Sequence, residues 1–540
     1  MRRPVKLTPV SASIEISNAV YQNETQFRNL LQTGQFPCYF PVFRLFPLER
    51  PHQIPFMLEH LDTRRIRVGV LDFGDGRSFL QAPLEPVNRR FREALVRRLE
   101  AAGFEVVTAD EVIWQNDIAV RNGRRMAAAD VDAVIFSFSV WAWPQYARVA
   151  AQFCPQPVVM FSNVNPQYPG LVGMLANSGS LDQAGIRFSK SFGDIEDDAV
   201  FGRLRTTIAA IAAARRLRGL TYCLIGGRSL GIDTTVIDPA QWMTQFGIDV
   251  DHVDQMELVR RAELELTAGT RVTPALEYLK KAIGRIHWTP PDASFRLTED
   301  LLRRQLAMYC AAIDLVEEFK YDLCGIKGQR ELTEHFVTAD VAEAFLNDPY
   351  GPDGVAKPSI VCATEADSDA ALTMQIFKHL AGTPVLFADV RHYHRDLGVW
   401  DLCNSGEHAT YFAGASMDPA VNLPLTELRP QGFYFPAAGA AVYHIARPGR
   451  VTLARLTRSN RRYVMTIVPA EFVDFGSRNH EIAAISQDNW PHAFARFSCS
   501  VDTFIENFHC NHIHGVYGDW IPELELLCGV LDIDCRVLRS

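Results

Sequence analysis

The feature that most constrains the fold is a regular alternation of short apolar runs with helical stretches, which begins near Arg67. The apolar runs are rich in Val, Ile and Phe and predict strands at 68–71, 133–138, 158–162 and 222–225. Between them lie segments with helical spacing of apolar residues, at 86–102, 144–153 and 202–215. Continuous apolar strands separated by helices are typical of parallel sheets that helices cover on both faces. We therefore predict doubly wound α/β layers.

The chain has 540 residues, which is too long for a single hydrophobic core. The α/β pattern restarts near Arg218 and continues through strands at 324–326, 360–363 and 385–387, with a long helix at 298–320. Beyond about residue 390, apolar segments such as 450–456 and 462–468 lack intervening helices. We predict two Rossmann-like α/β domains with doubly wound parallel sheets at 66–217 and 218–385, then a mostly antiparallel, β-rich (α+β) C-terminal domain at 386–540. Residues 1–65, dense in Pro and aromatic residues, are expected to form an N-terminal arm.

Composition argues against several classes of partner. The net charge of −9 is spread along the chain and no basic face is evident, so nucleic acid is not expected to bind. No stretch approaches the roughly 18 apolar residues that a membrane span needs, and no apolar signal region follows the basic N-terminus. Eleven scattered cysteines without a Cys-x-x-Cys pair indicate reduced thiols. We expect a soluble, cytoplasmic protein.

Three segments carry side chains that can bind a metal. Two follow or end apolar strands, TEADSD with Glu365 and Asp367 and FADVRHYH with Asp389, and the third is HCNHIHG with His509, His512 and His514. In an open α/β sheet, ligands collect at the carboxyl ends of strands, so Glu365 and Asp389 are well placed. Two carboxylates and an imidazole suit Mn²⁺, Mg²⁺ or Co²⁺ and leave positions for substrate oxygens. Asp367, just before a predicted helix, is expected to cap it instead.

These segments, in order, resemble motifs of the L-fucose isomerase family over roughly residues 66–540. The matching stretches are ATEADSDAALTMQIFKHLAGTPVLFADVRHY, LCNSG and CNHIHGVYGDW, preceded by DFGDGRS, VWAWPQ, GGRSLGIDTTVID and GIKGQRELTEHF. The resemblance implies Mn²⁺ held by Glu365, Asp389 and His512. It further implies that the monosaccharide substrate, L-fucose or D-arabinose, lies near five more residues: Arg77, Trp141, Ser405, Trp490 and Asn511. Trp141 would complete the site of a neighbouring subunit in a homohexamer.

The same residues support a ketol-isomerase mechanism. Interconverting an aldose and a ketose moves a hydrogen between C1 and C2, and a metal on the sugar oxygens stabilises the enediolate that forms. Glu365 and Asp389 are the expected acid/base pair. His509 and His514 do not fall on the family's ligand position. Two rivals remain open: a non-catalytic sugar-binding protein on the same fold, and a metal-dependent hydrolase.

Two positions depart from the family pattern. Lys327 stands where these isomerases commonly carry Gln, and Gly439 falls near a Tyr that approaches the sugar. A lysine offers donors and a positive charge, whereas Gln offers both a donor and an acceptor. Lys327 therefore either pairs with a nearby acid, Glu331 or Glu365, or contacts an anionic sugar. The GGRSLG loop after the strand at 222–225 is either a tight turn or a phosphate-binding loop, and we favour the turn.

Overall fold

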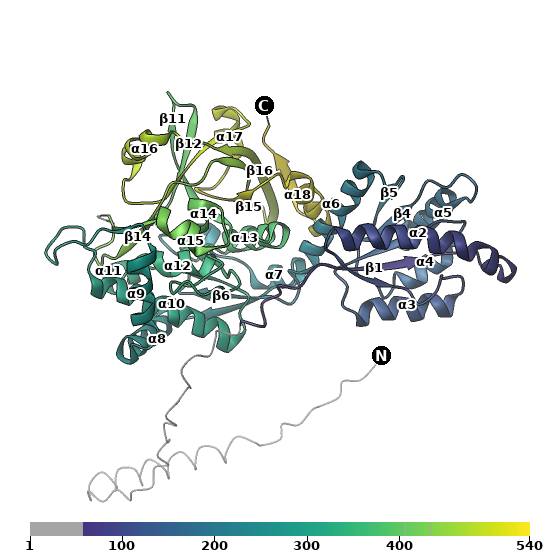
Figure 1. The fold of residues 1–540 in the computed structure, drawn as a ribbon, viewed down its shortest axis with the longest axis horizontal. Helices are drawn as coiled ribbons and strands as arrows, with labels where there is room; N and C mark the ends of the chain where they lie inside the picture. The colour runs from purple at the N-terminus through teal and green to yellow at the C-terminus, as the bar shows by residue number, and fades with distance from the viewer. Residues whose placement is uncertain (1–57, 406, 433, 540) are drawn as a thin grey trace, which may run out of the picture. The chain divides into compact units, whose positions relative to one another are not determined.

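The computed structural model of the chain describes residues 58–405, 407–432 and 434–539. Most of the arm expected over 1–65 lies outside these residues. The described residues belong to one unit of the chain, Phe56–Ser540. Three large sheets follow one another along the sequence, and Figure 1 shows them with the helices that cover them.

The first sheet is parallel throughout, with strand order β2-β1-β3-β4-β5. Both faces are buried: Leu71 and Phe136 pack into one apolar cluster, and Val70 and Ile135 into another on the opposite face. This confirms the prediction made from continuous apolar strands. The strands are β1 (Arg67–Asp72), β2 (Glu105–Thr108), β3 (Ala133–Phe138), β4 (Val158–Ser162) and β5 (Phe188–Phe192). The helices are α2 (Gln81–Ala101), α3 (Asn116–Ala128), α4 (Pro144–Ala150), α5 (Gly170–Gln183) and α6 (Asp198–Arg215).

The second sheet is also parallel, with order β10-β9-β6-β7. Cys324 and Ile326 pack with helix α10 on one face, while Leu323 and Val361 pack with α7 and α13 on the other. The strands are β6 (Thr221–Ile225), β7 (Asp249–Val253), β9 (Leu323–Ile326) and β10 (Val361–Thr364). The helices are α7 (Pro239–Gln245), α8 (Gln255–Ala268), α9 (Val272–Ala282), α10 (Glu299–Phe319), α11 (Glu331–His335), α12 (Asp340–Asn347) and α13 (Ser368–Ala381).

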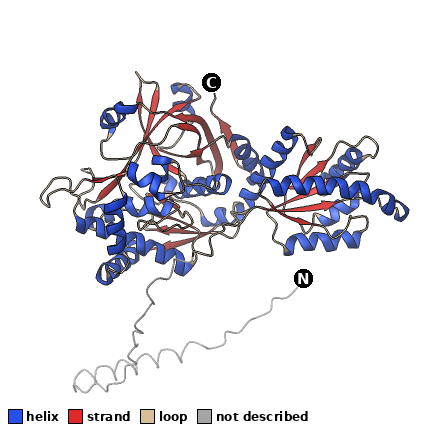
Figure 2. Ribbon diagram, viewed as in Figure 1, coloured by secondary structure: helices blue, strands red, loops and turns tan. Residues whose placement is uncertain are grey.

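The third sheet is mostly antiparallel, as predicted, and it closes on itself. Its order is β15-β18-β11-β12-β17-β16-β19, and β15 pairs with β16, so six strands form a barrel with β19 outside. Closure removes the open edges that would otherwise invite pairing with other chains. The strands form a curved wall in Figure 2. They are β11 (Leu386–His394), β12 (Val399–Cys403), β15 (Gly449–Ser459), β16 (Arg462–Phe472), β17 (His492–Phe497), β18 (His512–Tyr517) and β19 (Asp534–Val537).

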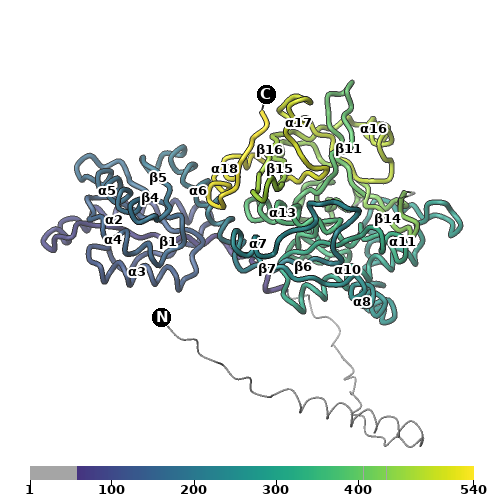
Figure 3. The backbone as a smooth tube through the Cα atoms, turned by 180° about the vertical axis from the view of Figure 1, so that it is seen from behind, coloured from purple at the N-terminus to yellow at the C-terminus, as the bar shows by residue number. Residues whose placement is uncertain are grey.

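A small sheet joins the second and third parts of the chain. Strand β8 (Arg285–Ile286) runs parallel to β13 (Glu427–Pro430), which pairs with β14 (Ala440–Tyr443). Four short helices lie in the connections between the barrel strands: α14 (Tyr411–Gly414), α15 (Pro419–Asn422), α16 (Asn479–Ser486) and α17 (Val501–Asn507). Near the C-terminus, α18 (Ile521–Leu531) lies against α6, as Figures 1 and 3 both show. No described helix is long and apolar enough to cross a membrane.

One local expectation was wrong. The apolar run at 385–387 predicts a further strand of the parallel pattern, with Asp389 at its end. The structure instead places Asp389 inside the nine-residue strand β11, which pairs antiparallel with β12 and β18. An apolar run indicates a strand but not its partner, and the partners of β11 come much later in the chain.

Candidate metal centre

The candidate metal centre forms where β10 of the second sheet meets β11 and β18 of the barrel. Asp389 and His512 are directly opposite each other in the antiparallel β11–β18 pair, so both side chains project from one face. Glu365 comes immediately after β10. It has a φ of +57° and Ala366 a φ of +51°, a left-handed conformation that residues with a Cβ rarely adopt. These two residues turn the chain between the end of β10 and helix α13.

The donor atoms of three predicted residues converge. Nε2 of His512 lies 3.1 Å from Oε2 of Glu365 and 3.5 Å from Oδ1 of Asp389. The His512 side chain is 1% exposed, whereas those of Glu365 and Asp389 are 14% and 24% exposed. The carboxylates therefore face outward from a buried imidazole. Oε2 of Glu365 is buried and has no hydrogen-bond partner among the described residues.

Asp367 and Arg455 hold the other side of the imidazole. Nδ1 of His512 lies 2.6 Å from Oδ2 of Asp367, and both oxygens of Asp367 accept from the Arg455 guanidinium at 2.9 and 2.8 Å. A hydrogen bond from Nδ1 to a carboxylate fixes the tautomer that leaves Nε2 free to bind a metal. Asp367 also caps α13, accepting from the backbone N–H of Ala370, as the sequence predicted.

The electrostatics of the centre favour a cation beside Nε2. Burial alone would lower the pKa of His512, but the carboxylates of Asp367, Glu365 and Asp389 outweigh it and raise this pKa. The same negative field that favours a proton on His512 favours a metal ion there. Burial raises the pKa of Asp389. The charge of His512 and the hydrogen bond from Asn511 lower this pKa, but by less than burial raises it. For Asp367, the Arg455 and His512 charges more than offset burial and lower the pKa.

A second grouping of donor atoms overlaps this one. Asp367, Cys510 and His512 each offer an atom within 4.8 Å of the others. Both oxygens of Asp367 are engaged by Arg455, and one of them also contacts His512, so Asp367 has little capacity left for a metal. The buried Oε2 of Glu365, by contrast, lies against Nε2 of His512 and has no other hydrogen-bond or ion-pair partner among the described residues. The set Glu365, Asp389 and His512 therefore fits a metal better.

Three buried acids line the interior next to Glu365. Burial raises the pKa of Asp340 to about 6, although hydrogen bonds from Thr338, Gln431 and Ser405 act to lower it. Burial, and then repulsion from neighbouring carboxylates, also raises the pKa values of Glu343 and Glu407. A cavity of about 10 Å³, enough for one water, is lined by Glu365 together with Asp340 and Glu343. The interior side of Glu365 therefore has little free space.

The predicted sugar-binding residues fall into two groups. Asn511 donates to Oδ1 of Asp389 at 3.1 Å, and Ser405 lines the small cavity with Glu365. The indole N–H of buried Trp490 donates to Gln431 at 2.7 Å, so Trp490 can offer a sugar its ring but no donor. Arg77 and Trp141 belong to the first domain, where Arg77 pairs with Asp75 at 2.6 Å. No described contact joins these two residues to the metal centre of the same chain.

The two positions that depart from the family pattern have local explanations. Nζ of Lys327 lies 2.8 Å from a carboxylate oxygen of Glu331, one of the two partners expected from the sequence. Gly439 is buried with a φ of +132°, and a Cβ there would lie 2.8 Å from Oγ1 of Thr338. The absence of a Tyr at Gly439 therefore opens no space for a larger substrate.

Other predicted residues lie around rather than in the centre. His509 is exposed, and Nε2 of buried His514 lies 3.0 Å from Nη1 of Arg455. Sequence reasoning missed Arg455. A charged residue within the apolar run of β15 was the available signal, because such a residue is rarely buried without a partner.

The GGRSLG loop does not open directly into a helix. It leads from β6 into a short 3-10 helix at Asp233–Thr235, and α7 begins only at Pro239.

Comparison with known proteins identifies the family of the chain. Models for the L-fucose isomerase first N-terminal, second N-terminal and C-terminal domains match residues 65–219, 220–382 and 402–538. Glu365 and His512 lie within these ranges, and Asp389 lies between two of them. An L-fucose isomerase of Haemophilus influenzae is 25% identical over 409 residues, 67% of this chain and 68% of that protein. One from Escherichia coli is 28% identical over 338 residues, covering 55% of this chain and 54% of that protein. The chain therefore belongs to the L-fucose isomerase family of ketol-isomerases, which are intramolecular oxidoreductases.

Proposed function

We propose that this chain is a divalent-metal-dependent aldose–ketose isomerase that acts on L-fucose, D-arabinose or a related neutral sugar. The observation that carries the proposal is the convergence of Glu365 and Asp389 on Nε2 of His512, with Nδ1 held by Asp367. The names of the relatives, L-fucose isomerases, support the choice of sugar.

The donor set fits a divalent metal. Glu365 offers a buried oxygen whose single described partner is Nε2 of His512, and the remaining ligands are one carboxylate and one imidazole whose tautomer is set by Asp367. Oxygen-rich sets with one imidazole suit Mn²⁺, and Co²⁺ or Mg²⁺ are compatible alternatives. Three protein ligands leave coordination positions for two sugar oxygens. We infer Mn²⁺ as the resident ion.

A divalent ion bound there supplies the Lewis acidity that polarises a sugar carbonyl. The chain's own carboxylates move the proton. Burial raises the pKa of Asp389 above its ordinary value, which makes this carboxylate a stronger proton acceptor than an exposed one. Asn511 holds one oxygen of Asp389. Removal of the proton next to the carbonyl gives an enediolate, and Glu365 or Asp389 returns the proton to the adjacent carbon.

A neutral sugar is favoured over an anionic one. The positive charge of Lys327 is neutralised by Glu331. The hydrogen bond from Lys327 lowers the pKa of the Glu331 carboxyl. Lys327 therefore needs no anion from the substrate.

We further propose a cytoplasmic homohexamer. Arg77 and Trp141 lie on the first domain, and we infer that they reach the metal centre of a neighbouring subunit. Ten cysteines lie in the described part of the chain, and all ten are free, which suits a reducing compartment. Light scattering tests the assembly: an active monomer would contradict it.

The test of function is a sugar panel followed by NMR, with Mn²⁺ and after chelation. We expect L-fucose or D-arabinose to give the corresponding ketose only with metal. Glu365→Gln should lose both bound metal and turnover while its circular dichroism is unchanged. Glu331→Gln, the same change at an exposed neighbouring carboxylate, is the matched control and should retain both. A cleaved product would identify a hydrolase, and sugar binding without turnover would identify a binding protein; either result refutes the proposal.

A further inference from the structure

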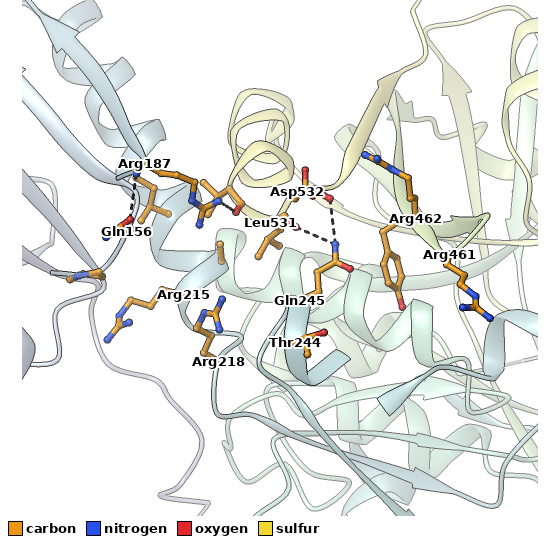
Figure 4. Close-up of a pocket in the computed structure, with 15 residues that line it drawn as sticks. Gln156, Arg187, Arg215, Arg218, Thr244, Gln245, Arg461, Arg462, Leu531 and Asp532 are labelled. Atoms are coloured by element: carbon orange, nitrogen blue, oxygen red, sulfur yellow. Dashed lines mark hydrogen bonds between the residues drawn. The ribbon is translucent and has the colours of Figure 1, made fainter. Parts of the chain in front are cut away.

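A cleft lined by arginines has none of the three metal ligands among its lining residues. Its volume is about 530 Å³, within the range of small-molecule sites. Six segments form it: the loop before β4, the residue before β5, the end of α6, the end of α7, the β15–β16 hairpin and the end of α18. Figure 4 shows Arg187, Arg215 and Arg218 on one side of Gln245, with Arg461 and Arg462 on the other.

The charge of this cleft is strongly positive. Five arginines line it and Asp532 is the single carboxylate among its lining residues. The whole chain, by contrast, carries a net charge of −9. The positive charge is therefore gathered locally against the overall balance of the protein, as in sites that attract anions.

Only part of that charge is neutralised by the protein. Arg215 pairs with Asp130 at 3.0 Å and Arg462 with Asp534 at 3.2 Å. Arg187 donates to the backbone oxygen of Val530 at 2.7 Å, which fixes its position but leaves its charge unpaired. The guanidinium groups of Arg218 and Arg461 have no hydrogen bond or ion pair with any residue that the structure describes. Arg187, Arg218 and Arg461 are exposed and keep their charge at any ordinary pH, so an anion that enters the cleft would meet donors that no protein group occupies.

The backbone at Arg461 is a second, independent observation. Asn460 and Arg461 form the two-residue turn between β15 and β16, with φ values of +50° and +67°. Two-residue hairpin turns with both φ values positive strongly favour Asn-Gly, because glycine has no Cβ to clash. An arginine at the glycine position is unfavourable for the turn itself. The turn therefore presents a guanidinium group where folding alone would favour glycine.

We propose that this cleft binds a small phosphate-bearing molecule. Guanidinium groups bind phosphate oxygens through paired N–H donors, and arginines on two sides of a cleft can contact separate oxygens of one ligand. The N-terminal segment of this chain is a poor occupant, since residues 1–57 contain more Lys and Arg than Asp and Glu. The ligand would touch β5 and α6 of the first domain together with α18 and the barrel hairpin, and would hold these segments together.

The experiment measures binding to the full chain by isothermal titration calorimetry at fixed ionic strength. The probes are inorganic phosphate, glucose 6-phosphate and AMP, with unphosphorylated glucose as the neutral control. We expect one saturable site per chain for at least one phosphate-bearing probe and none for glucose. The probe that binds tightest shows whether free phosphate, a sugar phosphate or a nucleotide is the source of the group.

Three variants make the proposal falsifiable. Arg218→Gln and Arg461→Gly should each weaken binding about tenfold or more, the effect of losing a charged hydrogen bond. Arg461→Gly should also raise the melting temperature without ligand, because it relieves the turn. The control, Arg90→Gln with Arg478→Gln, removes two exposed arginines elsewhere and should bind as the wild type does. Equal binding by wild type and Arg218→Gln, or a change of oligomeric state without phosphate binding, would overturn the proposal.

Discussion

Replacing Asp367 by Asn tests how the imidazole of His512 is positioned. The Asp367 and Arg455 side chains are both 0% exposed and share two hydrogen bonds. Removing one partner of a buried ion pair costs about 3–5 kcal/mol, because the remaining charge is left buried and unpaired. Arg455 cannot lose its proton, so we expect the free energy of unfolding to fall by that amount.

The same substitution should weaken metal binding. Nδ1 of His512 now donates to an anionic oxygen at 2.6 Å, and Asn can offer only a neutral one. Loss of such an outer hydrogen bond typically lowers metal affinity by about 10–100-fold. The two effects can be separated, since unfolding is measured in urea with a chelator present and affinity by titrating Mn²⁺ into the folded protein.

Asp369→Asn provides a matched control on the same helical turn. Asp369 is also 0% exposed and pairs with Arg458 at 2.9 Å, but its other described hydrogen bond is from Tyr463 and it does not contact His512. It should lose stability without losing metal affinity. If Asp367→Asn binds Mn²⁺ as tightly as Asp369→Asn does, the role assigned to Asp367 is wrong.

Three further predictions concern residues near the centre. Burial raises the pKa of Asp340 to about 6, so the folded state binds a proton that the unfolded state has lost, and stability relative to Asp340→Asn should fall by about 2 kcal/mol as pH rises from 4 to 6; an equal difference between the urea midpoints of the two proteins at both pH values would refute this. Lys327→Gln removes a partly exposed pair with Glu331 and should cost less than about 0.5 kcal/mol, with the ratio of L-fucose to D-arabinose rates unchanged; a changed ratio would place Lys327 against the sugar. Gly439→Ala adds a Cβ 2.8 Å from Thr338 at a φ of +132°, and should cost about 1–3 kcal/mol by urea unfolding; wild-type stability would show that the loop can relax.

Much of the architecture was accessible from local sequence patterns. Apolar runs predicted β3 and β4 with their bounds as observed, and the spacing of apolar residues predicted the long helix α10. Asp367 was recognised as a helix cap from its position before α13. These inferences succeed because strand and helix periodicity, and capping, depend on neighbouring residues.

The pairing of distant segments could not be predicted in the same way. The sequence by itself determined that Glu365, Asp389 and His512 are chemically suited to bind one metal ion. Only the tertiary structure decided that Asp389 sits inside a barrel strand opposite His512, and that Arg455 reaches Asp367 behind them. Strand partners and buried ion pairs join residues about 90 to 120 positions apart here, and no local pattern encodes which distant segment will supply the partner.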